Sequence, residues 1–218
     1  MPKRIRSGLG HSRIALRVWG WSYRWTLAYV PDRAHLPYVL NRRGLLGVGY
    51  EIGVQQGVFS AWLLERWRGR RLVSVDAWSV EIEEDLRNPR VTQAEHDRFF
   101  QIAQARLAPY GDRSEIWRTE SVEAAARVAP ASADFVYIDG RHDYKAVSAD
   151  IAAWFPRIRP GGLLAGHDYY DGKRDGLTYG VKRAVDELCA EHGLELALTR
   201  RDFPEQSWLV FVPERPVF

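Results

Sequence analysis

The stretch that decides the fold is ADFVYIDGRHDY, residues 133–144. Its apolar run, FVYI, has the length and the β-branched or aromatic residues of a buried strand. The run ends in Asp139, and His142 and Asp143 follow within four residues. A chain leaving the core needs a polar residue, but a cluster of ionisable groups indicates either a solvated turn or a functional site.

On both sides of this stretch, apolar runs of strand length alternate with helical patterns. Further strands are expected at 47–53, 71–77, 114–119, 162–168, 194–200 and 207–212, beside the one at 134–140. Helical periodicity covers 57–67, 94–108, 121–128, 144–158 and 180–193. Strands that alternate with helices form a parallel sheet covered on both faces. We therefore predict a doubly wound α/β fold with a mostly parallel seven-stranded sheet, helices on both faces and an antiparallel C-terminal hairpin.

The length and composition indicate an ordinary globular protein. The chain has 218 residues, of which 46% are hydrophobic and 27% charged. Its single cysteine, Cys189, excludes an internal disulfide and a thiolate metal cluster. No segment approaches the ~20 apolar residues of a membrane span. Arg13, Arg17 and Arg24 interrupt the apolar part of the N-terminus, which argues against a signal peptide. We expect a cytoplasmic protein without a membrane partner.

The positive charge is concentrated near the N-terminus. Residues 1–43 carry nine Lys or Arg against a single acid, Asp32, whereas the rest of the chain is net acidic. We therefore predict a basic, Trp-rich arm at 1–43 and one domain at 44–218. Such an arm could contact nucleic acid. We favour packing on the body or on a second copy of the chain, because no nucleic-acid motif accompanies the charge.

Three predicted strands end in an aspartate: Asp76, Asp139 and Asp168. In a doubly wound sheet the ligand binds outside the carboxyl ends of the strands, so these three carboxylates are expected on one edge. A turn needs a polar residue, but not the same one three times. This repetition favours a functional site over solvated turns.

The loop after the first strand reads GYEIGVQQGVFS, residues 49–60, and differs from the dinucleotide fingerprint G-x-G-x-x-G. Gly53 and Gly57 bracket the turn, and Glu51 precedes them, so the loop suits an ammonium group better than a pyrophosphate. Asp76, after the next strand, is placed to accept hydrogen bonds from ribose hydroxyls. Nucleoside plus ammonium describes S-adenosylmethionine; the alternative is an ordinary tight turn followed by a capping acid.

Five segments in order carry a family resemblance: YEIGVQQGVFS (50–60), VSVDAW (73–78), ADFVYIDGRHDY (133–144), RPGGLLAGHDYYDG (159–172) and GVKRAVDEL (180–188). Together they resemble the class I S-adenosylmethionine-dependent methyltransferases, which have a Rossmann-like fold. Within that class they are similar to a small bacterial branch related to metal-assisted O-methyltransferases of the catechol and antibiotic-sugar types. The resemblance covers about residues 45–190.

The resemblance implies roles for particular residues. Cofactor contacts are implied for Glu51, Gly53, Gly57, Asp76, Trp78, Ser121 and Asp139, with Trp78 and Ser121 beside the adenine. Metal ligation is implied for Asp139 and Asp168. The relatives place two adjacent oxygen ligands after the fifth strand, where this chain has His167 and Asp168. A histidine can bind a divalent metal, but Mg²⁺ prefers oxygen, so either His167 is a ligand or it points away from the site and the third ligand is water. A second departure is Gln55, which stands where the commonest loop has a third glycine.

The chemistry that these residues support is methyl transfer to a hydroxyl. A neutral hydroxyl is a poor nucleophile, and a metal or a positioned base can activate it. His142, three residues after Asp139, is the candidate base because imidazole titrates near neutral pH. We predict a methyltransferase acting on a small molecule or sugar, with Mg²⁺ assistance left open. The alternatives are an NAD(P)-dependent oxidoreductase, an RNA methyltransferase and a non-catalytic cofactor-binding protein.

Overall fold

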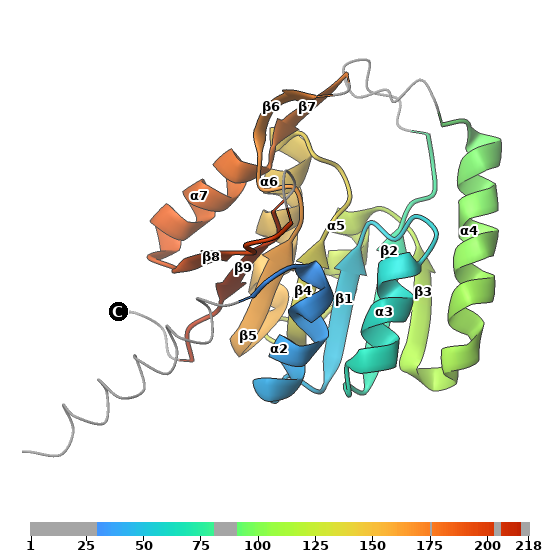
Figure 1. Ribbon diagram of the computed structural model, residues 1–218, viewed down its shortest axis with the longest axis horizontal. Helices are drawn as coiled ribbons and strands as arrows, with labels where there is room; N and C mark the ends of the chain where they lie inside the picture. The colour runs from blue at the N-terminus through green and yellow to red at the C-terminus, as the bar shows by residue number, and fades with distance from the viewer. Residues whose placement is uncertain (1–29, 81–90, 175, 203–205, 215–218) are drawn as a thin grey trace, which may run out of the picture.

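The computed structural model describes residues 30–80, 91–174, 176–202 and 206–214. Seven strands form the main sheet, in the order β3-β2-β1-β4-β5-β9-β8 (Figure 1). Their bounds are Val48–Ile52 (β1), Arg71–Asp76 (β2), Ser114–Arg118 (β3), Ala133–Ile138 (β4), Ile158–Gly166 (β5), Leu196–Leu198 (β8) and Trp208–Phe211 (β9). Strands β1 to β5 run parallel, and β9 is antiparallel to both β5 and β8. The predicted doubly wound sheet with a C-terminal hairpin is confirmed.

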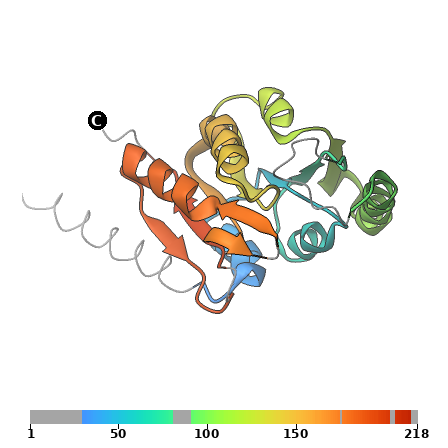
Figure 2. The same ribbon diagram turned by 90° about the horizontal axis from the view of Figure 1, so that it is seen from above.

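Helices cover both faces of the sheet, as Figures 1 and 2 show. One face carries α2 (Leu36–Arg42), α3 (Val58–Arg66) and α4 (Gln93–Leu107). The other carries α5 (Ser121–Ala126), α6 (Tyr144–Trp154) and α7 (Val181–His192). Short 3-10 turns lie at Arg33–His35 (η1), Ala108–Arg113 (η2) and Phe155–Arg157 (η3).

The central strand β4 shows how the sequence builds the two layers. All six of its residues are buried. Phe135 and Tyr137 belong to the apolar cluster on the α2 and α3 side, whereas Val136 and Ile138 belong to the cluster on the α5 to α7 side. Successive strand residues point to opposite faces, so a continuous apolar run is what a strand buried on both faces requires.

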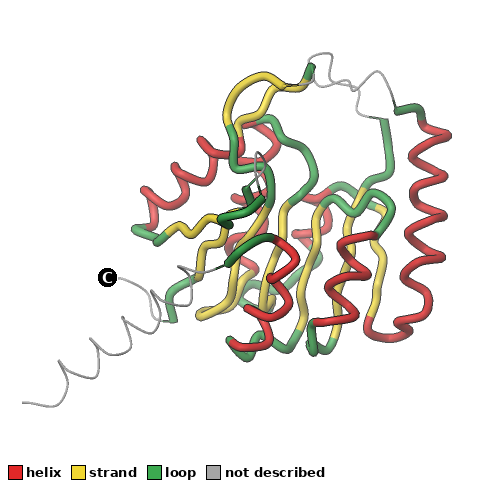
Figure 3. The backbone as a smooth tube through the Cα atoms, in the orientation of Figure 1, coloured by secondary structure: helices red, strands yellow, loops and turns green. Residues whose placement is uncertain are grey.

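Two features of the fold differ from the sequence prediction or add to it. A second, two-stranded sheet, β6 (Asp171–Arg174) paired with β7 (Leu177–Gly180), occupies a stretch for which we predicted no strand; Figure 3 shows it above the main sheet. Its sequence is polar and glycine-rich, and therefore lacks the apolar alternation of a strand. The later part of the predicted arm also packs on the domain, with Val30, Leu36 and Leu40 buried.

The predicted arm at residues 1–29 lies outside the described residues. Among the helices that the structure describes, none has the length and apolar character needed to cross a membrane. The carboxyl ends of β1, β2, β4 and β5 meet along one edge of the sheet, where the residues singled out by sequence lie.

Candidate active site

The loop after β1 is shaped by backbone contact with the end of β4. Gly53 has φ +86°, and a Cβ built on it would lie 2.1 Å from the carbonyl oxygen of Asp139. No other residue type fits there, because both the backbone angle and the space exclude a side chain. Gly57 has φ +72° and forms the N-cap of α3. The loop that we expect to hold a cofactor therefore touches the strand end that carries Asp139.

Asp76 holds this loop through its backbone amides. Its carboxylate accepts hydrogen bonds from the amides of Val54 at 2.8 Å, Gln55 at 2.9 Å and Trp78 at 2.8 Å. Gln55 has φ +50°, a conformation that the third glycine of the commonest loop adopts without strain. Gln55 thus carries a side chain at positive φ, and the hydrogen bond from its amide to Asp76 helps to hold it there.

Trp78 and Ser121, the two residues that the resemblance puts beside the adenine, follow the neighbouring strands β2 and β3, and the residues next to them meet where the Ser79 hydroxyl donates to the Glu120 carboxylate at 3.5 Å. The Trp78 side chain is 1% exposed, with its ring 4.8 Å from that of Phe100, and its indole N–H donates to the carbonyl oxygen of Gln55 at 2.8 Å. This hydrogen bond ties the buried indole of Trp78 to the loop after β1. Ser121 begins α5, and its hydroxyl accepts a hydrogen bond from the indole of Trp154 at 2.9 Å.

Glu51 is a buried carboxylate beside this loop. It is 1% exposed, and burial raises its pKa to about 8. The hydroxyl of Ser74 donates to it across a long 3.5 Å. Burial disfavours the ionised form of Glu51, and protein groups stabilise that form only weakly. A cationic ligand beside Glu51 would favour its ionisation. The donor set of Glu51, Asp76 and the glycine loop thus fits the ammonium and ribose of S-adenosylmethionine.

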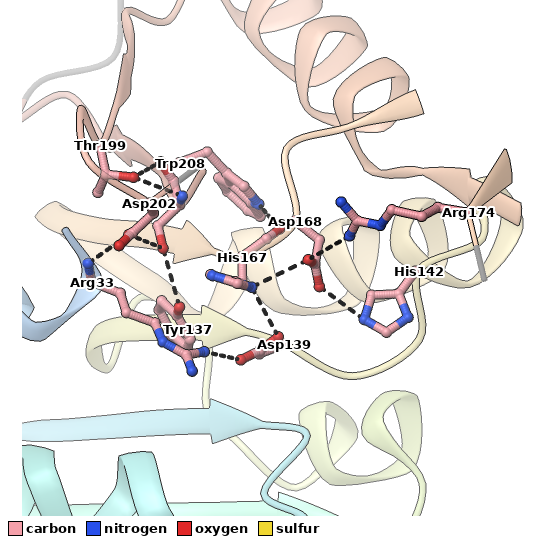
Figure 4. A network of polar contacts seen from close by, with 11 residues as sticks. Arg33, Tyr137, Asp139, His142, His167, Asp168, Arg174, Thr199, Asp202 and Trp208 are labelled. Atoms are coloured by element: carbon pink, nitrogen blue, oxygen red, sulfur yellow. Dashed lines mark hydrogen bonds and ion pairs between the residues drawn. The ribbon is translucent and has the colours of Figure 1, made fainter. Parts of the chain in front are cut away.

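The second half of the site is a cluster of two aspartates and two histidines at the ends of β4 and β5 (Figure 4). His142 Nε2 lies 2.9 Å from Oδ2 of Asp168. His167 Nδ1 lies 3.3 Å from Oδ1 of Asp168 and 3.8 Å from Oδ1 of Asp139. Asp168 has φ +54°, an unfavourable angle for a residue with a side chain. Strained residues of this kind cluster at functional sites.

The charges in this cluster stabilise one another. Burial opposes ionisation of Asp168, but hydrogen bonds from His142 and His167 outweigh it and hold its pKa well below the usual range. Burial also opposes charging of the two histidines, yet the Asp168 carboxylate raises the pKa of each. Asp139 differs, because burial raises its pKa to about 6. Asp168 is therefore the fixed negative charge of the site.

The structure groups Asp139, His142 and Asp168 so closely that one ligand atom from each lies within 4.8 Å of the others. This geometry fits a divalent cation. The sequence expectation named His167 as the histidine ligand beside the two aspartates, and His167 is also near both carboxylates. Each histidine is thus a candidate third ligand, and the mixed oxygen and nitrogen donors suit Mn²⁺, Fe²⁺ or Zn²⁺ better than Mg²⁺.

Sequence reasoning missed two contributors to this site. Arg33, from η1, places its Nη1 3.0 Å from Oδ2 of Asp139. The β6–β7 hairpin lies against His142: the ring of Tyr179 is 4.9 Å from the imidazole, and the amide of Gly180 donates to the carbonyl oxygen of His142 at 2.8 Å. Arg33 is 106 positions from its partner in sequence, and neither contact has a local motif.

Comparison with known proteins identifies the fold. The O-methyltransferase from Bacillus cereus in complex with SAH is 17% identical, with a TM-score of 0.58 over 93% of this chain and 92% of that one. The N-methyltransferase NodS from Bradyrhizobium japonicum is 18% identical, with a TM-score of 0.54 over 83% and 96%. A methyltransferase from Geobacter sulfurreducens is 15% identical, with a TM-score of 0.53 over 95% and 91%. The fold is the Rossmann-like fold of the class I S-adenosylmethionine-dependent methyltransferases.

The family follows from the sequence match. A family model described as a methyltransferase domain matches residues 50–169, more than half of the chain, and the protein belongs to this family. The Sinorhizobium fredii protein y4gI is 34% identical over 101 residues, which are 42% of this chain and 11% of that protein. The match thus spans about a tenth of the length of that relative.

Proposed function

We propose that the protein transfers a methyl group from S-adenosylmethionine to a hydroxyl of a small molecule or sugar. One observation carries the proposal: the cofactor-type loop and the ionisable cluster meet at a single point, where Gly53 packs on the backbone of Asp139. A methyl donor bound by the loop would therefore lie beside His142 and Asp168.

In this proposal each residue has a defined task. Glu51 receives the ammonium of the cofactor and Asp76 its ribose, while Gly53 and Gly57, both at positive φ, shape the loop that lies between them. Asp168 orients the imidazole of His142 through the 2.9 Å contact with Nε2. The other ring nitrogen, Nδ1, takes the proton of the acceptor hydroxyl while the hydroxyl oxygen attacks the methyl carbon; the bond from that carbon to the sulfonium sulfur breaks, and S-adenosylhomocysteine leaves. Asp168 stabilises the imidazolium that results.

A divalent ion, where bound, would lower the pKa of the acceptor hydroxyl. Asp139 and Asp168 would be its carboxylate ligands, and His167, which lies near both, would complete the set while His142 serves as base. This assignment separates the two histidines. His142→Asn should abolish transfer and retain Mn²⁺ binding, whereas His167→Asn should weaken Mn²⁺ binding. The opposite pattern would assign the ligand role to His142.

The first test is calorimetric titration with S-adenosylmethionine and, separately, with NAD, each with and without Mg²⁺ or Mn²⁺. Binding of S-adenosylmethionine alone supports the proposal, and transfer assays with hydroxylated acceptors follow. Binding of NAD instead would overturn it and favour an oxidoreductase. The same assays should use Glu51→Gln, because a lost contact with the ammonium weakens cofactor binding without disturbing the His142 cluster.

The class of acceptor molecule needs a separate test, because an O-methyltransferase and an N-methyltransferase both share this fold. A panel of catechols, sugars, amines and RNA, with radiolabelled methyl donor, separates the alternatives. Transfer to a hydroxyl that His142→Asn eliminates supports the proposal. Transfer to amines or to RNA, with RNA binding that weakens steeply as salt rises, would replace it.

A further inference from the structure

Arg33 brings a positive charge from the N-terminal part of the domain onto a carboxylate that a metal would use. Its guanidinium Nη1 lies 3.0 Å from Oδ2 of Asp139, and its side chain is 42% exposed against 20% for Asp139. Figure 4 shows this arginine on the side of Asp139 opposite His142. A second arginine, Arg174 of β6, lies 4.0 Å from Oδ1 of Asp168. Both candidate carboxylate ligands therefore already face a guanidinium.

The position of Arg33 is built by the fold. Its backbone N–H donates to the carboxylate of Asp202 at 2.7 Å, and its guanidinium lies 5.4 Å from the ring of Phe59. The preceding Pro31 accepts a hydrogen bond from the amide of Arg201 at 2.7 Å. The segment is thus fixed on the loop between β8 and β9, and the guanidinium is directed at Asp139.

This contact conflicts with a metal ion at the same carboxylate. Oδ2 of Asp139 is engaged by Arg33, and Oδ1 lies 3.8 Å from His167. A divalent ion shared by Asp139 and Asp168 would stand a few ångströms from the guanidinium. At that distance, in a partly buried site, like charges repel strongly and salt screens them poorly.

We propose that Arg33 is a built-in competitor of a divalent metal ion at Asp139, which couples metal loading to the docked position of residues 30–35. The inference rests on the proposed function and deepens it, because it names a regulator of the same site. The coupling is reciprocal: a bound ion weakens the docking of Arg33 by the same factor by which docked Arg33 weakens the ion.

The test is calorimetric titration of the full chain with Mn²⁺, without cofactor or acceptor. Arg33→Gln should bind Mn²⁺ about tenfold more tightly than the wild type, and Arg33→Lys should lie between them. The matched control is Arg71→Gln, which removes another arginine–carboxylate pair, 3.0 Å from Glu115, at the opposite end of β2. It should bind Mn²⁺ as the wild type does. In an Asp139→Asn background the gain from Arg33→Gln should vanish.

A second measurement uses hydrogen exchange of the Arg33 amide, which the bond to Asp202 protects. Mn²⁺ should accelerate exchange at this amide in the wild type. Equal Mn²⁺ affinity of the wild type and Arg33→Gln would overturn the inference and leave the proposed function standing. Weaker Mn²⁺ binding by a folded Arg33→Gln would also overturn it. If neither protein binds Mn²⁺, the inference and the metal role both fail, while binding of S-adenosylmethionine still tests methyl transfer.

Discussion

The two halves of the carboxyl edge are held together by different groups. Around the loop after β1, Asp76 accepts hydrogen bonds from three backbone amides, and Gly53 packs on the backbone of Asp139. Around the ends of β4 and β5, ionisable side chains pair with one another, as His142 does with Asp168. Backbone contacts determine the shape of the loop after β1, whereas the paired side chains determine the charges at the ends of β4 and β5. The first half should therefore respond to changes of volume and the second to changes of charge.

The largest effect is expected where the two halves touch. Gly53→Ala places a Cβ 2.1 Å from the carbonyl oxygen of Asp139 at φ +86°, so the loop or the strand end must move. We expect the free energy of unfolding to fall by about 3 kcal/mol or more, and binding of S-adenosylmethionine to be lost. Chemical denaturation and calorimetry measure the two effects.

The control for this change is Gly140→Ala, on the other side of the same contact. A Cβ there meets its nearest neighbour only at 3.9 Å. Its free energy of unfolding should stay within about 1 kcal/mol of the wild type. Similar losses in the two variants would show that close packing does not explain the glycine at position 53.

The second effect is a loss of rate when an ionisable side chain is removed from the ends of β4 and β5. His142→Asn should lower the rate of methyl transfer by about 10²- to 10⁴-fold, because the general base is removed. Binding of S-adenosylmethionine should change less than twofold. The matched control is His192→Asn, a histidine at the end of α7 with 42% of its side chain exposed, which should keep the full rate. An unchanged rate in His142→Asn would remove the base from the mechanism.

The third effect is a pH dependence of cofactor binding. It arises in the loop half of the site, because Glu51 lies beside that loop and titrates. Burial raises its pKa to about 8, so it is mostly protonated at pH 6 and must ionise to pair with an ammonium. The ratio of wild-type to Glu51→Gln affinity for S-adenosylmethionine should therefore rise about tenfold per pH unit up to about pH 8 and then level off. Taking the ratio cancels the titration of the ligand itself.

The same carboxyl predicts the sign of a change in stability. Between pH 4.5 and about 8 the folded protein retains the Glu51 proton that the unfolded chain has lost. Stability contributed by this proton is therefore lost as the pH rises through that range, and Glu51→Gln should be spared the loss. A pH-independent difference between the two proteins, in binding and in unfolding, would show that Glu51 is ionised throughout.

The smallest effect tests the support beneath the loop. Trp78→Phe removes the hydrogen bond to the carbonyl oxygen of Gln55 and should lower the free energy of unfolding by about 1 kcal/mol. The affinity for S-adenosylmethionine should fall severalfold. Trp62→Phe is the control, because its indole also donates to a backbone carbonyl, that of Ala34 at 2.9 Å. It should cost similar stability and leave the affinity unchanged.

Sequence patterns predicted the central strands well because these strands are largely buried on both faces. The expected strand at 134–140 corresponds to β4, Ala133–Ile138, and the expected strand at 71–77 to β2, Arg71–Asp76. Such runs are mostly apolar and have the length of a strand, so one sequence suffices to find them. The polar β6–β7 hairpin is held by packing on other elements, and local patterning does not reveal it.

The candidate site likewise contains residues that the sequence predicts and a residue that it does not predict. Asp139, His142 and Asp168 follow strands directly, and the topology of a parallel sheet brings strand ends together. Arg33 reaches Asp139 only because residues 30–33 dock on the loop between β8 and β9. A long-range contact of this kind depends on the finished fold, so neither spacing nor residue type could have indicated it.

The strand β9 is synthesised after its two neighbours in the sheet, β5 and β8. β9, Trp208–Phe211, lies between β5 and β8 and pairs with both, although it follows them in the chain. During synthesis the edge of β5, with Leu163, Leu164 and Ala165, has no partner in the main sheet until residues 208–211 emerge from the ribosome. An unpaired apolar strand edge is a template for aggregation. Shielding of this edge by a chaperone would favour the yield of folded protein.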